Sequence, residues 1–498
     1  MANSNPGSSE PLPSPQPETN KLSETNIRLI FGLKLKQFRK SRKLSLKELS
    51  EASGLSISYL NEIEKGKKYP KTDKALALAQ ALKVPYDDLI SLKLVGPLEA
   101  LSQILSTPFL QNFPLQEFGI TTSGLMEFMS NHPDRFSTLI TTVARIAHRH
   151  ELDHEQLNVA ALRSHIELHQ NYFPHLERAA DSFRRSQNWP LHPCPDWQQL
   201  AAFLSTRFNY HVDLESLDKD PPLRTYRSAY KSHRKNPTLF LNPRLAPSQL
   251  AFHLAREIAF CTLGLEDRAN SDVIKPHHSF HQLFNNFQAS YFAGCLLLNR
   301  QTLTEDIRHV LAQRTLNSSS LHRWLFKYNV TPELLFHRLA QLLPTRLSLP
   351  EMFFLRVDYN NQDDSFKIGK ELHFSRIQGP AAFNRTEHYC QNWPHKSFLK
   401  SLTKNAKKPT ALISRVHFNA IQEDYLLTSM AYPSPLIPGH YSCVTLGLLL
   451  DTRLKRIMRF WNDDAIENIT VAPQTEASLH SENTLALREE ALKKLLLS

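Results

Sequence analysis

The pattern of apolar and polar residues divides the chain into a helical first part and a later part in which strands appear. Apolar residues recur at helical spacing from Leu33, Phe38 and Leu44 onward, and again through residues 96–190. From residue 351 the spacing becomes that of strands, as in "MFFLRVDY" and "SFKIGKELHF". We therefore expect a multidomain chain that is mainly α, with an α+β C-terminal part.

The first periodic segment carries the start and stop signals of two short helices around a glycine turn. Ser45 begins the first helix, and Glu48 three residues later completes a capping box. Gly54 ends that helix, and Ser56 caps the next one, "ISYLNEIEKG", which closes at Gly66. Two short helices joined in this way, with supporting helices around them, predict a helix-turn-helix.

Positive charge is concentrated in the same segment. Residues 34–74 hold twelve Lys and Arg and five acidic residues, which accounts for +7 of the net charge of +11. Such a basic patch is typical of a protein that binds a polyanion. Together with the predicted helix-turn-helix, it indicates a double-stranded DNA operator as a partner.

Residues 31–92 resemble the XRE (Cro/C1-type) family of DNA-binding domains, above all in "LSLKELSEASGLSISYLNEIEKGKKYP". The family has five helices, and its second helix of the pair enters the major groove by its N-terminal end. The resemblance implies base contacts from the start of that helix and phosphate contacts from the lysines after it. The expected DNA-binding residues are Ser45, Lys47, Ser56, Ile57, Ser58, Tyr59, Glu62, Lys65, Lys67 and Lys68.

Individual residues of this segment indicate which bases they are expected to contact. Ile57 is able to contact a thymine methyl group, and Glu62 is able to accept a hydrogen bond from cytosine. Leu46 stands where the family often has a glutamine that contacts DNA. We therefore expect Ser45 or Lys47 to supply that missing polar contact.

The rest of the chain divides by composition and periodicity. A Pro- and Ser-rich N-terminal tail is expected to be disordered. A helical connector comes after the DNA-binding domain and is the expected dimer surface, because one helix-turn-helix reads only a half-site. The expected limits are 1–26 for the tail, 27–95 for the DNA-binding domain, 96–190 for the connector, 191–350 for a zincin-like α+β domain, 351–470 for an antiparallel-sheet, sensor-like C-terminal domain, and 471–498 for a C-terminal tail helix.

The segment "SQLAFHLAREIAF", residues 248–260, has the form of a zinc-peptidase helix without its metal ligands. The order of strand, short loop and helix resembles the ImmA/IrrE metallopeptidase family, whose helix reads H-E-x-x-H. Glu257 keeps the place of the general base, while Arg256 and Phe260 fill the two histidine positions. The next helix offers amides where the family has its acidic third ligand. Because Arg stays protonated and cannot ligate zinc, we expect no metal and no peptidase activity.

Two alternatives remain for this helix. It can be structural, with Glu257 paired to Arg256 or to another neighbour, or it can hold a salvaged zinc site. The salvaged site would draw on His253, Glu257, His277, His278 and His281. If the fold is kept as a pocket, nearby cationic residues are expected to attract an anionic ligand such as the phosphates of CoA. The expected pocket residues are Arg256, Lys275, His277 and His281.

Taken together, these parts resemble the short-chain fatty acyl-CoA-responsive regulators of bacteria. The segments that carry the resemblance are "NNFQASYFAGCLLL", "FHRLAQLLP", "KELHFSR" and "EHYCQNW". The resemblance implies a C-terminal regulator domain and an acyl-CoA or related metabolite as ligand. Members of the family often end in a Cys-rich segment, but "ENITVAPQTEASLHSENTLALREE" contains no Cys. We therefore expect no cofactor, neither a metal ion nor an iron–sulfur cluster.

The sequence thus predicts a sequence-specific transcription regulator that is not an enzyme. We expect it to be cytoplasmic, because its five Cys form no CxxC pairs and its N-terminus lacks a secretory signal. No apolar run approaches the length of a membrane span. A homodimer is the expected assembly. The alternatives are a metallopeptidase of the ImmA/IrrE type that acts on a partner regulator, and a scaffold that binds a protein and no small molecule.

Overall fold

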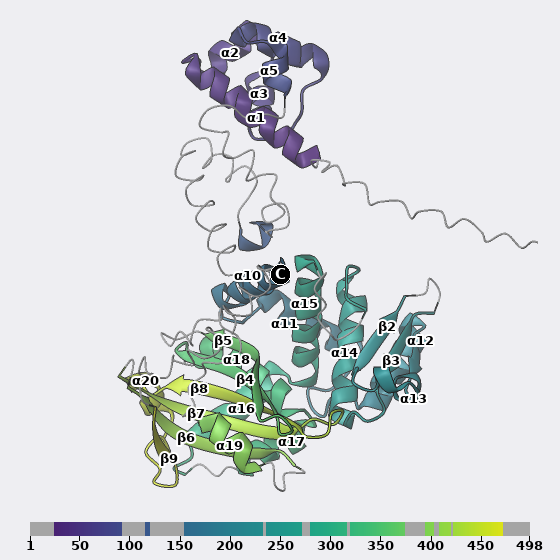
Figure 1. Cartoon of the computed structure of the whole chain (residues 1–498), viewed down its shortest axis with the longest axis vertical. Coiled ribbons are helices and arrows are strands. Elements are labelled where there is room, and N and C mark those ends of the chain that lie inside the picture. Colours follow the sequence, from purple (N-terminus) through teal and green to yellow (C-terminus); the bar gives the residue numbers. More distant parts are fainter. Residues whose placement is uncertain are drawn as a thin grey trace, which may run out of the picture. The chain divides into compact units, whose positions relative to one another are not determined.

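The computed structural model describes residues 24–91, 115–119, 154–232, 236–270, 279–315, 319–373, 394–402, 408–419 and 422–471. The chain forms two compact units, Met1–Leu152 and Asp153–Ser498 (Figure 1). The first helix begins at Glu24, so the last residues of the expected tail 1–26 are helical. The rest of that tail and the expected tail helix after residue 471 lie outside the described residues.

The first unit contains five helices within residues 24–91, as the resemblance implied. They are α1 (Glu24–Ser41), α2 (Leu46–Ser53), α3 (Ile57–Glu64), α4 (Thr72–Leu82) and α5 (Tyr86–Ile90). Apolar faces from all five meet in one small core, which includes Phe31, Leu49, Leu60, Leu78 and Leu89. A single helical turn, Leu115–Phe118, is also described in this unit.

The helix boundaries of this unit match the predicted caps. The Ser45 hydroxyl accepts from the Glu48 amide at 3.2 Å, and the Glu48 carboxylate accepts from the Ser45 amide at 2.7 Å. Gly54 ends α2 with a φ of 71°, in the left-handed region that glycine adopts without strain. Ser56 then accepts from the Tyr59 amide and starts α3. The predicted capping box and glycine stop are confirmed.

The second unit begins with helices packed around a small sheet. The helices are α10 (His154–Leu168), α11 (Pro174–Ser186), α12 (Trp197–Phe208), the single turns α13 (Ser216–Lys219) and η3 (Pro221–Leu223), α14 (Pro247–Leu263), α15 (Phe280–Leu297), α16 (Arg300–Leu311), α17 (Ser319–Tyr328) and α18 (Pro332–Arg346). In the sheet, β1 (His211–Asp213) lies parallel to β3 (Thr238–Leu241), and β2 (Ser228–Lys231) lies antiparallel to β3.

The later part of the expected connector 96–190 is not separate from the rest of the second unit. Both α10 and α11 pack against α15, and Ile166, Leu176 and Phe183 lie in the same core as the zincin-like helices. Apart from one turn, the earlier part of the connector lies outside the described residues. The described part of the connector is helical and packs into this core, while its limits and its role as a dimer surface stay predictions.

A six-stranded sheet completes the second unit, in the order β5-β4-β8-β7-β6-β9. Its strands are β4 (Met352–Asn360), β5 (Ser365–His373), β6 (Thr410–Phe418), β7 (Glu423–Pro433), β8 (His440–Leu449) and β9 (Glu467–Val471), with the helices α19 (Pro394–Leu402) and α20 (Thr452–Ile457) between them. The sheet is antiparallel except at β9, which lies parallel to β6. This edge strand is the one departure from the predicted antiparallel sheet.

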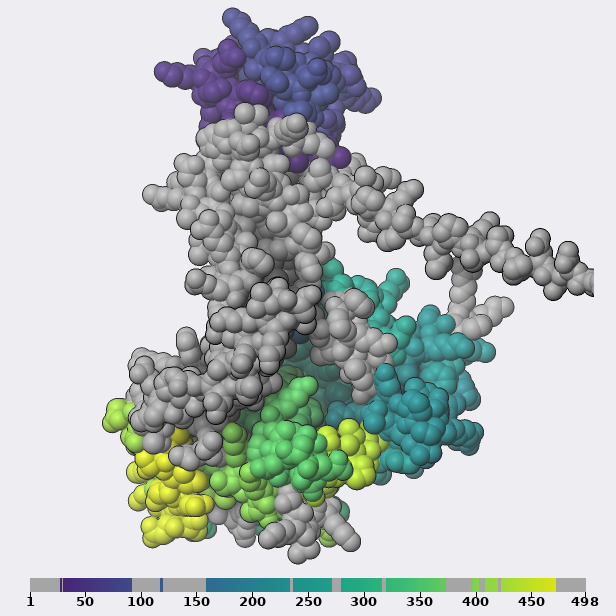
Figure 2. Space-filling view, viewed as in Figure 1, coloured from purple at the N-terminus to yellow at the C-terminus, as the bar shows by residue number. Residues whose placement is uncertain are grey.

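Alternation along the strands divides the sheet into two buried faces. Met352 and Phe354 join the large core shared with the helices, while Phe353 and Leu355 face a smaller core closed by α19. The large core runs from Ile166 to Ile466, so the expected domains 191–350 and 351–470 share one core. Their teal and green-to-yellow surfaces lie side by side (Figure 2). The domain limits themselves stay predictions.

No helix in the described parts of the chain is both long and apolar enough to cross a bilayer.

Candidate functional site

The expected DNA-binding residues fall on the start of α2, the start of α3 and the turn after α3. Most of these side chains are exposed, and Ile57 has an exposed fraction of 47%, which is high for an apolar residue. Tyr59 and Glu62 are partly buried. A single apolar side chain exposed at the entering end of α3 is consistent with the predicted contact to a thymine methyl group.

Two of the expected contacts are joined to each other. The Lys68 ammonium lies 2.8 Å from the Glu62 carboxylate, and the hydrogen bond lowers the pKa of Glu62. Lys68 and Lys74 also lie over the ring of Tyr59, at 5.8 and 4.6 Å from its centroid. Glu62 must therefore exchange or share its partner if it is to accept a hydrogen bond from a base.

Not every cation of the basic segment is available to DNA. Arg39 on α1 binds Glu64 at the end of α3 through two hydrogen bonds of 2.6 and 2.9 Å. Lys34 is buried, and its ammonium donates to the backbone carbonyls of Asp88 in α5 and of Ser91 just after it. These two residues hold α3 and α5 in place, so the charge count of the segment overstates its free surface charge.

In the second unit, the helix that resembles a zincin helix holds its glutamate in a buried ion pair. Glu257 on α14 has no exposed surface, and both its oxygens accept hydrogen bonds of 2.6 Å from Arg268. The Arg268 guanidinium stacks between the rings of Phe260 and Tyr230, at 3.7 and 3.9 Å from their centroids. The partner of Glu257 is thus Arg268 and not Arg256, which donates to Ser228.

Of the salvaged zinc site, only His253, Glu257 and His281 belong to the described residues, and they form no metal-binding group. His253 lines a cavity, whereas Glu257 is occupied by Arg268 and is not part of the cavity wall. His281 is exposed, and His277 and His278 lie outside the described residues. Within the described residues, no group of three or more His, Cys, Asp or Glu is placed to hold a metal ion.

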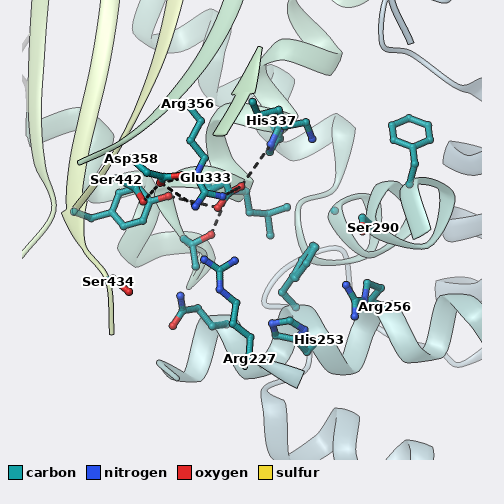
Figure 3. Close-up of a pocket in the computed structure, with 18 of the residues that line it drawn as sticks. Arg227, His253, Arg256, Ser290, Glu333, His337, Arg356, Asp358, Ser434 and Ser442 are labelled. Atoms are coloured by element: carbon teal, nitrogen blue, oxygen red, sulfur yellow. Dashed lines mark hydrogen bonds and ion pairs between the residues drawn. The ribbon is translucent and has the colours of Figure 1, made fainter. Parts of the chain in front are cut away.

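The cavity has a volume of about 500 Å³ and lies between the helices α14, α15 and α18 and the sheet strands β4, β5 and β8. Figure 3 shows Arg227, His253 and Arg256 on one side, facing Glu333 and Arg356 on the other. Of the predicted pocket residues, Arg256 lines this cavity and His281 does not. Lys275 and His277 lie outside the described residues.

The cavity wall carries more positive than negative charge. Its cations are Arg227, Arg256, Arg356, Lys367 and Lys370, and its carboxylates are Glu333 and Asp358. Arg356 neutralises both carboxylates, at 2.8 Å from Glu333 and 3.0 Å from Asp358. In the described chain, Arg227, Lys367 and Lys370 form no ion pair. The cavity therefore favours an anionic ligand.

A β-bulge brings the two lysines to the same side of β5. Residues three apart normally point to opposite faces of a strand. Here Arg356 pairs with Lys370 and Val357 pairs with Ile368, so Gly369 is the extra residue. A Cβ atom at Gly369 would lie 2.6 Å from a carboxylate oxygen of Asp358. Glycine at this position leaves room for the Asp358 carboxylate beside the backbone.

Several titratable groups of the same cavity wall have pKa values far from their ordinary ones. Burial lowers the pKa of His253 and of His337 well below the ordinary value, and nearby cations add to this effect. Burial alone would raise the pKa of Glu333, but the charge of Arg356 brings it down to about 2. At neutral pH the two histidines are neutral and Glu333 is charged.

Sequence reasoning missed most of this wall. It selected Arg256 but not Arg227, Arg356, Lys367 or Lys370, which come from a loop and two strands far along the chain. One local signal was present in "KIGK". A glycine inside a strand pattern indicates a bulge, and this one is flanked by two lysines.

Comparison with known families agrees with this layout. A family model described as "Helix-turn-helix" matches residues 35–89, and one described as "IrrE N-terminal-like domain", from a peptidase family, matches residues 217–340. The chain joins an XRE-type helix-turn-helix to an IrrE-like domain. It therefore has the DNA-binding module of a transcription regulator, followed by an IrrE-like domain.

The relatives of this chain include regulators that match most of its length and regulators that match only about 60 residues of it. The chain is 23% identical over 360 residues to the propionyl-CoA carboxylase regulator of Cereibacter sphaeroides, which covers 71% of this chain and 73% of that protein. It is 41% identical over 61 residues to the transcriptional repressor RghR of Bacillus subtilis, 12% of this chain and 45% of that protein. A solved structure of a Mycobacterium tuberculosis transcriptional regulator covers 64% of this chain and 90% of its own, with a TM-score of 0.44 and 17% identity.

Proposed function

We propose that this protein is a sequence-specific transcription regulator whose DNA affinity depends on an acyl-CoA or a related metabolite bound in the second unit. The observation that carries the proposal is the positively charged cavity of about 500 Å³ in a chain that also holds a helix-turn-helix. The distant relative named as a propionyl-CoA carboxylase regulator supports the same class of effector. A regulator of this kind acts in the cytoplasm, where its DNA is.

The chemistry of the cavity suits an amphipathic anion. Its inner wall includes apolar side chains that are almost fully buried, among them Ile166, Leu334 and Leu372. Lys367 and Lys370 line the same cavity but are exposed, so they stand at its rim. An acyl chain would lie against the apolar wall, while phosphates would be bound by the rim lysines and Arg227.

On the DNA side, we propose that Ser58, Ile57 and Glu62 read bases, while Lys65, Lys67 and Lys68 hold phosphates. Ser45 takes part as the cap of α2, with its hydroxyl at the helix end. We further propose a homodimer on a two-fold symmetric operator. Light scattering of the chain alone and with its selected DNA tests the dimer, and a monomer in both samples would contradict it.

Binding sites selected from a random DNA library by the full chain provide the operator for the main experiment. Fluorescence anisotropy then measures DNA affinity with propionyl-CoA, with CoA and with propionate. A change in affinity with propionyl-CoA that free propionate does not produce supports the proposal. Unchanged DNA affinity and no thermal shift with any CoA compound would instead favour the scaffold alternative.

The metallopeptidase alternative rests on the IrrE-like match over residues 217–340. Against it stand the replacement of both histidines by Arg256 and Phe260 and the closed ion pair of Glu257. A general base that is held by a guanidinium cannot act on metal-bound water. Incubation of the chain with a denatured substrate protein and added zinc tests this alternative directly.

A further inference from the structure

The corner between α10 and α11 places a buried, unsatisfied amide on the cavity wall. Asn171 has an exposed fraction of 2% and lines the cavity, and its side-chain nitrogen has no hydrogen-bond partner. Its φ of 53° lies in the left-handed region, which asparagine tolerates better than most residues. A buried amide N–H without an acceptor destabilises a fold. The unsatisfied Asn171 amide therefore indicates a ligand whose atoms accept its hydrogen bond.

A second group on the opposite helix is unsatisfied in the same way. His253 on α14 is buried, lines the cavity, and has no hydrogen-bond partner for Nδ1. Burial lowers the pKa of this imidazole, so it is neutral and able to donate or accept one hydrogen bond. Two unsatisfied polar groups on one cavity indicate a ligand with hydrogen-bonding atoms inside it, in addition to its charge.

The helix that ends at this corner is also tied to the cavity strand β5. Arg163 on α10 lies 3.2 Å from the carboxylate of Glu371, whose side chain is 8% exposed. Glu371 stands between Lys370 and Leu372, which both line the cavity. Ile166, one turn further along α10, lines it directly. Thus α10 contacts the cavity through its own side chains and through β5.

The contacts of α10 with the cavity matter for DNA binding because of the place of α10 in the chain. The second unit begins at Asp153 and its first described helix is α10, which starts at His154. The chain therefore enters the ligand-binding unit from the DNA-binding unit through this helix. This order along the chain is the reason to ask whether ligand binding at α10 affects DNA binding.

We propose that Asn171 donates a hydrogen bond to an oxygen atom of the ligand and that α10 carries the effect of ligand binding to the DNA-binding unit. This rests on the proposed function, since it requires an effector in the cavity. The acceptor is a carbonyl or phosphate oxygen, because an amide N–H donates to both. A ligand that satisfies Asn171 fixes the corner and thereby favours one position of α10 over another.

The substitution Asn171→Asp tests the contact, since it keeps the shape and the tolerance for the left-handed backbone but replaces the donor by a carboxylate. Isothermal titration of the full chain with propionyl-CoA should show an affinity at least about tenfold lower than that of wild type. Asn188→Asp is the matched control, because Asn188 has a φ of 54° but is exposed and outside the cavity. It should bind as wild type does.

The comparison of ligands identifies the acceptor. If Asn171→Asp weakens propionyl-CoA binding and not CoA binding, the acceptor is the acyl carbonyl. If it weakens both alike, the acceptor is a phosphate or another oxygen that the two ligands share. Should the variant fail to fold, Asn171→Gly replaces it, since glycine adopts this backbone freely. Unchanged affinity for both ligands in a folded variant overturns the contact.

The substitution Arg163→Met tests the coupling, since it keeps much of the side-chain length but breaks the link to Glu371. It should bind propionyl-CoA within about twofold of wild type yet lose most of the ligand-dependent change in DNA affinity. A full DNA response in this variant overturns the role of α10. A wild-type chain that neither binds nor responds to CoA compounds overturns the proposed effector, and this assignment with it.

Discussion

Arg268 holds Glu257 through two hydrogen bonds of 2.6 Å, so that a side-chain cation stands beside the residue that we expected at the general-base position of a zinc-peptidase helix. Its guanidinium covers Phe260, which we expected at the second histidine position of the H-E-x-x-H pattern. The charge of Glu257 is neutralised by a cationic side chain of the protein. Glu257 therefore has a structural role in this helix.

The first prediction concerns this ion pair. Arg268→Ala should lower the free energy of unfolding by about 3–5 kcal/mol, because it leaves the fully buried Glu257 carboxylate without its partner. Glu257→Leu combined with Arg268→Met should recover most of that loss, since two apolar side chains remove both buried charges. Urea unfolding followed by tryptophan fluorescence measures this in the second unit alone, because all five Trp lie beyond residue 188.

The ion pair of Glu257 and Arg268 also leads to a prediction about the metal content of the chain. The purified chain should contain no stoichiometric zinc by elemental analysis, and Glu257→Gln should leave DNA binding intact wherever the variant folds. One zinc per chain, lost in His253→Ala, would contradict this prediction and support the peptidase alternative.

The second prediction separates base reading from phosphate binding in α3 and the turn after it. Ser58→Ala and Glu62→Ala should change the order of preferred DNA sequences, whereas Lys67→Ala should weaken all sequences alike. Loss of one phosphate contact should also reduce the slope of log K against log salt by about 1. Equal effects of the three substitutions on every sequence would show that the recognition surface lies elsewhere.

Local signals predicted the first unit well, for a physical reason. Helix caps and glycine stops act within four residues, so Ser45, Glu48 and Gly54 specify α2 without help from the rest of the chain. The resemblance then supplied the arrangement of the helices. Neither revealed that Lys34 and Arg39 are structural, since burial depends on contacts 25 or more residues away.

The second unit was predicted less well because its site depends on long-range contacts. Glu257 was expected to pair with a neighbour, but the choice of Arg268 over Arg256 depends on the loop after α14. The cavity collects side chains from Ile166 to Ser442, and no periodicity within one element reveals such a set. The packing of α10 and α11 against this core could not be predicted from the sequence for the same reason.

The third prediction concerns the bulge that presents the two rim lysines. Gly369→Ala should lower the free energy of unfolding and the affinity for propionyl-CoA together, because the added methyl group would overlap the Asp358 carboxylate. Relief requires the Asp358 carboxylate to move, which disturbs its ion pair with Arg356. A strand bulge with this clash should cost about 1–3 kcal/mol. Wild-type stability and affinity in this variant would disprove the described register.

The fourth prediction concerns pH and uses the histidines of the cavity wall. The pKa of His253 and of His337 is lower in the folded chain than in the unfolded chain. The unfolded state therefore binds more protons below pH ~6.5, and the free energy of unfolding must fall as the pH falls. Each histidine should contribute up to about 1.4 kcal/mol per pH unit in this range.

Substitution and a lower pH window test this assignment. His253→Asn should reduce the slope of stability against pH between pH 6.5 and 5 by about one proton, measured by urea unfolding with tryptophan fluorescence. Glu333 acts in the same direction at lower pH, since its folded pKa of about 2 lies below the ordinary value of 4.5. Its contribution is complete above the ordinary value and is lost as the pH falls toward 2. A slope that is identical in wild type and His253→Asn would show that His253 takes up a proton in the folded state.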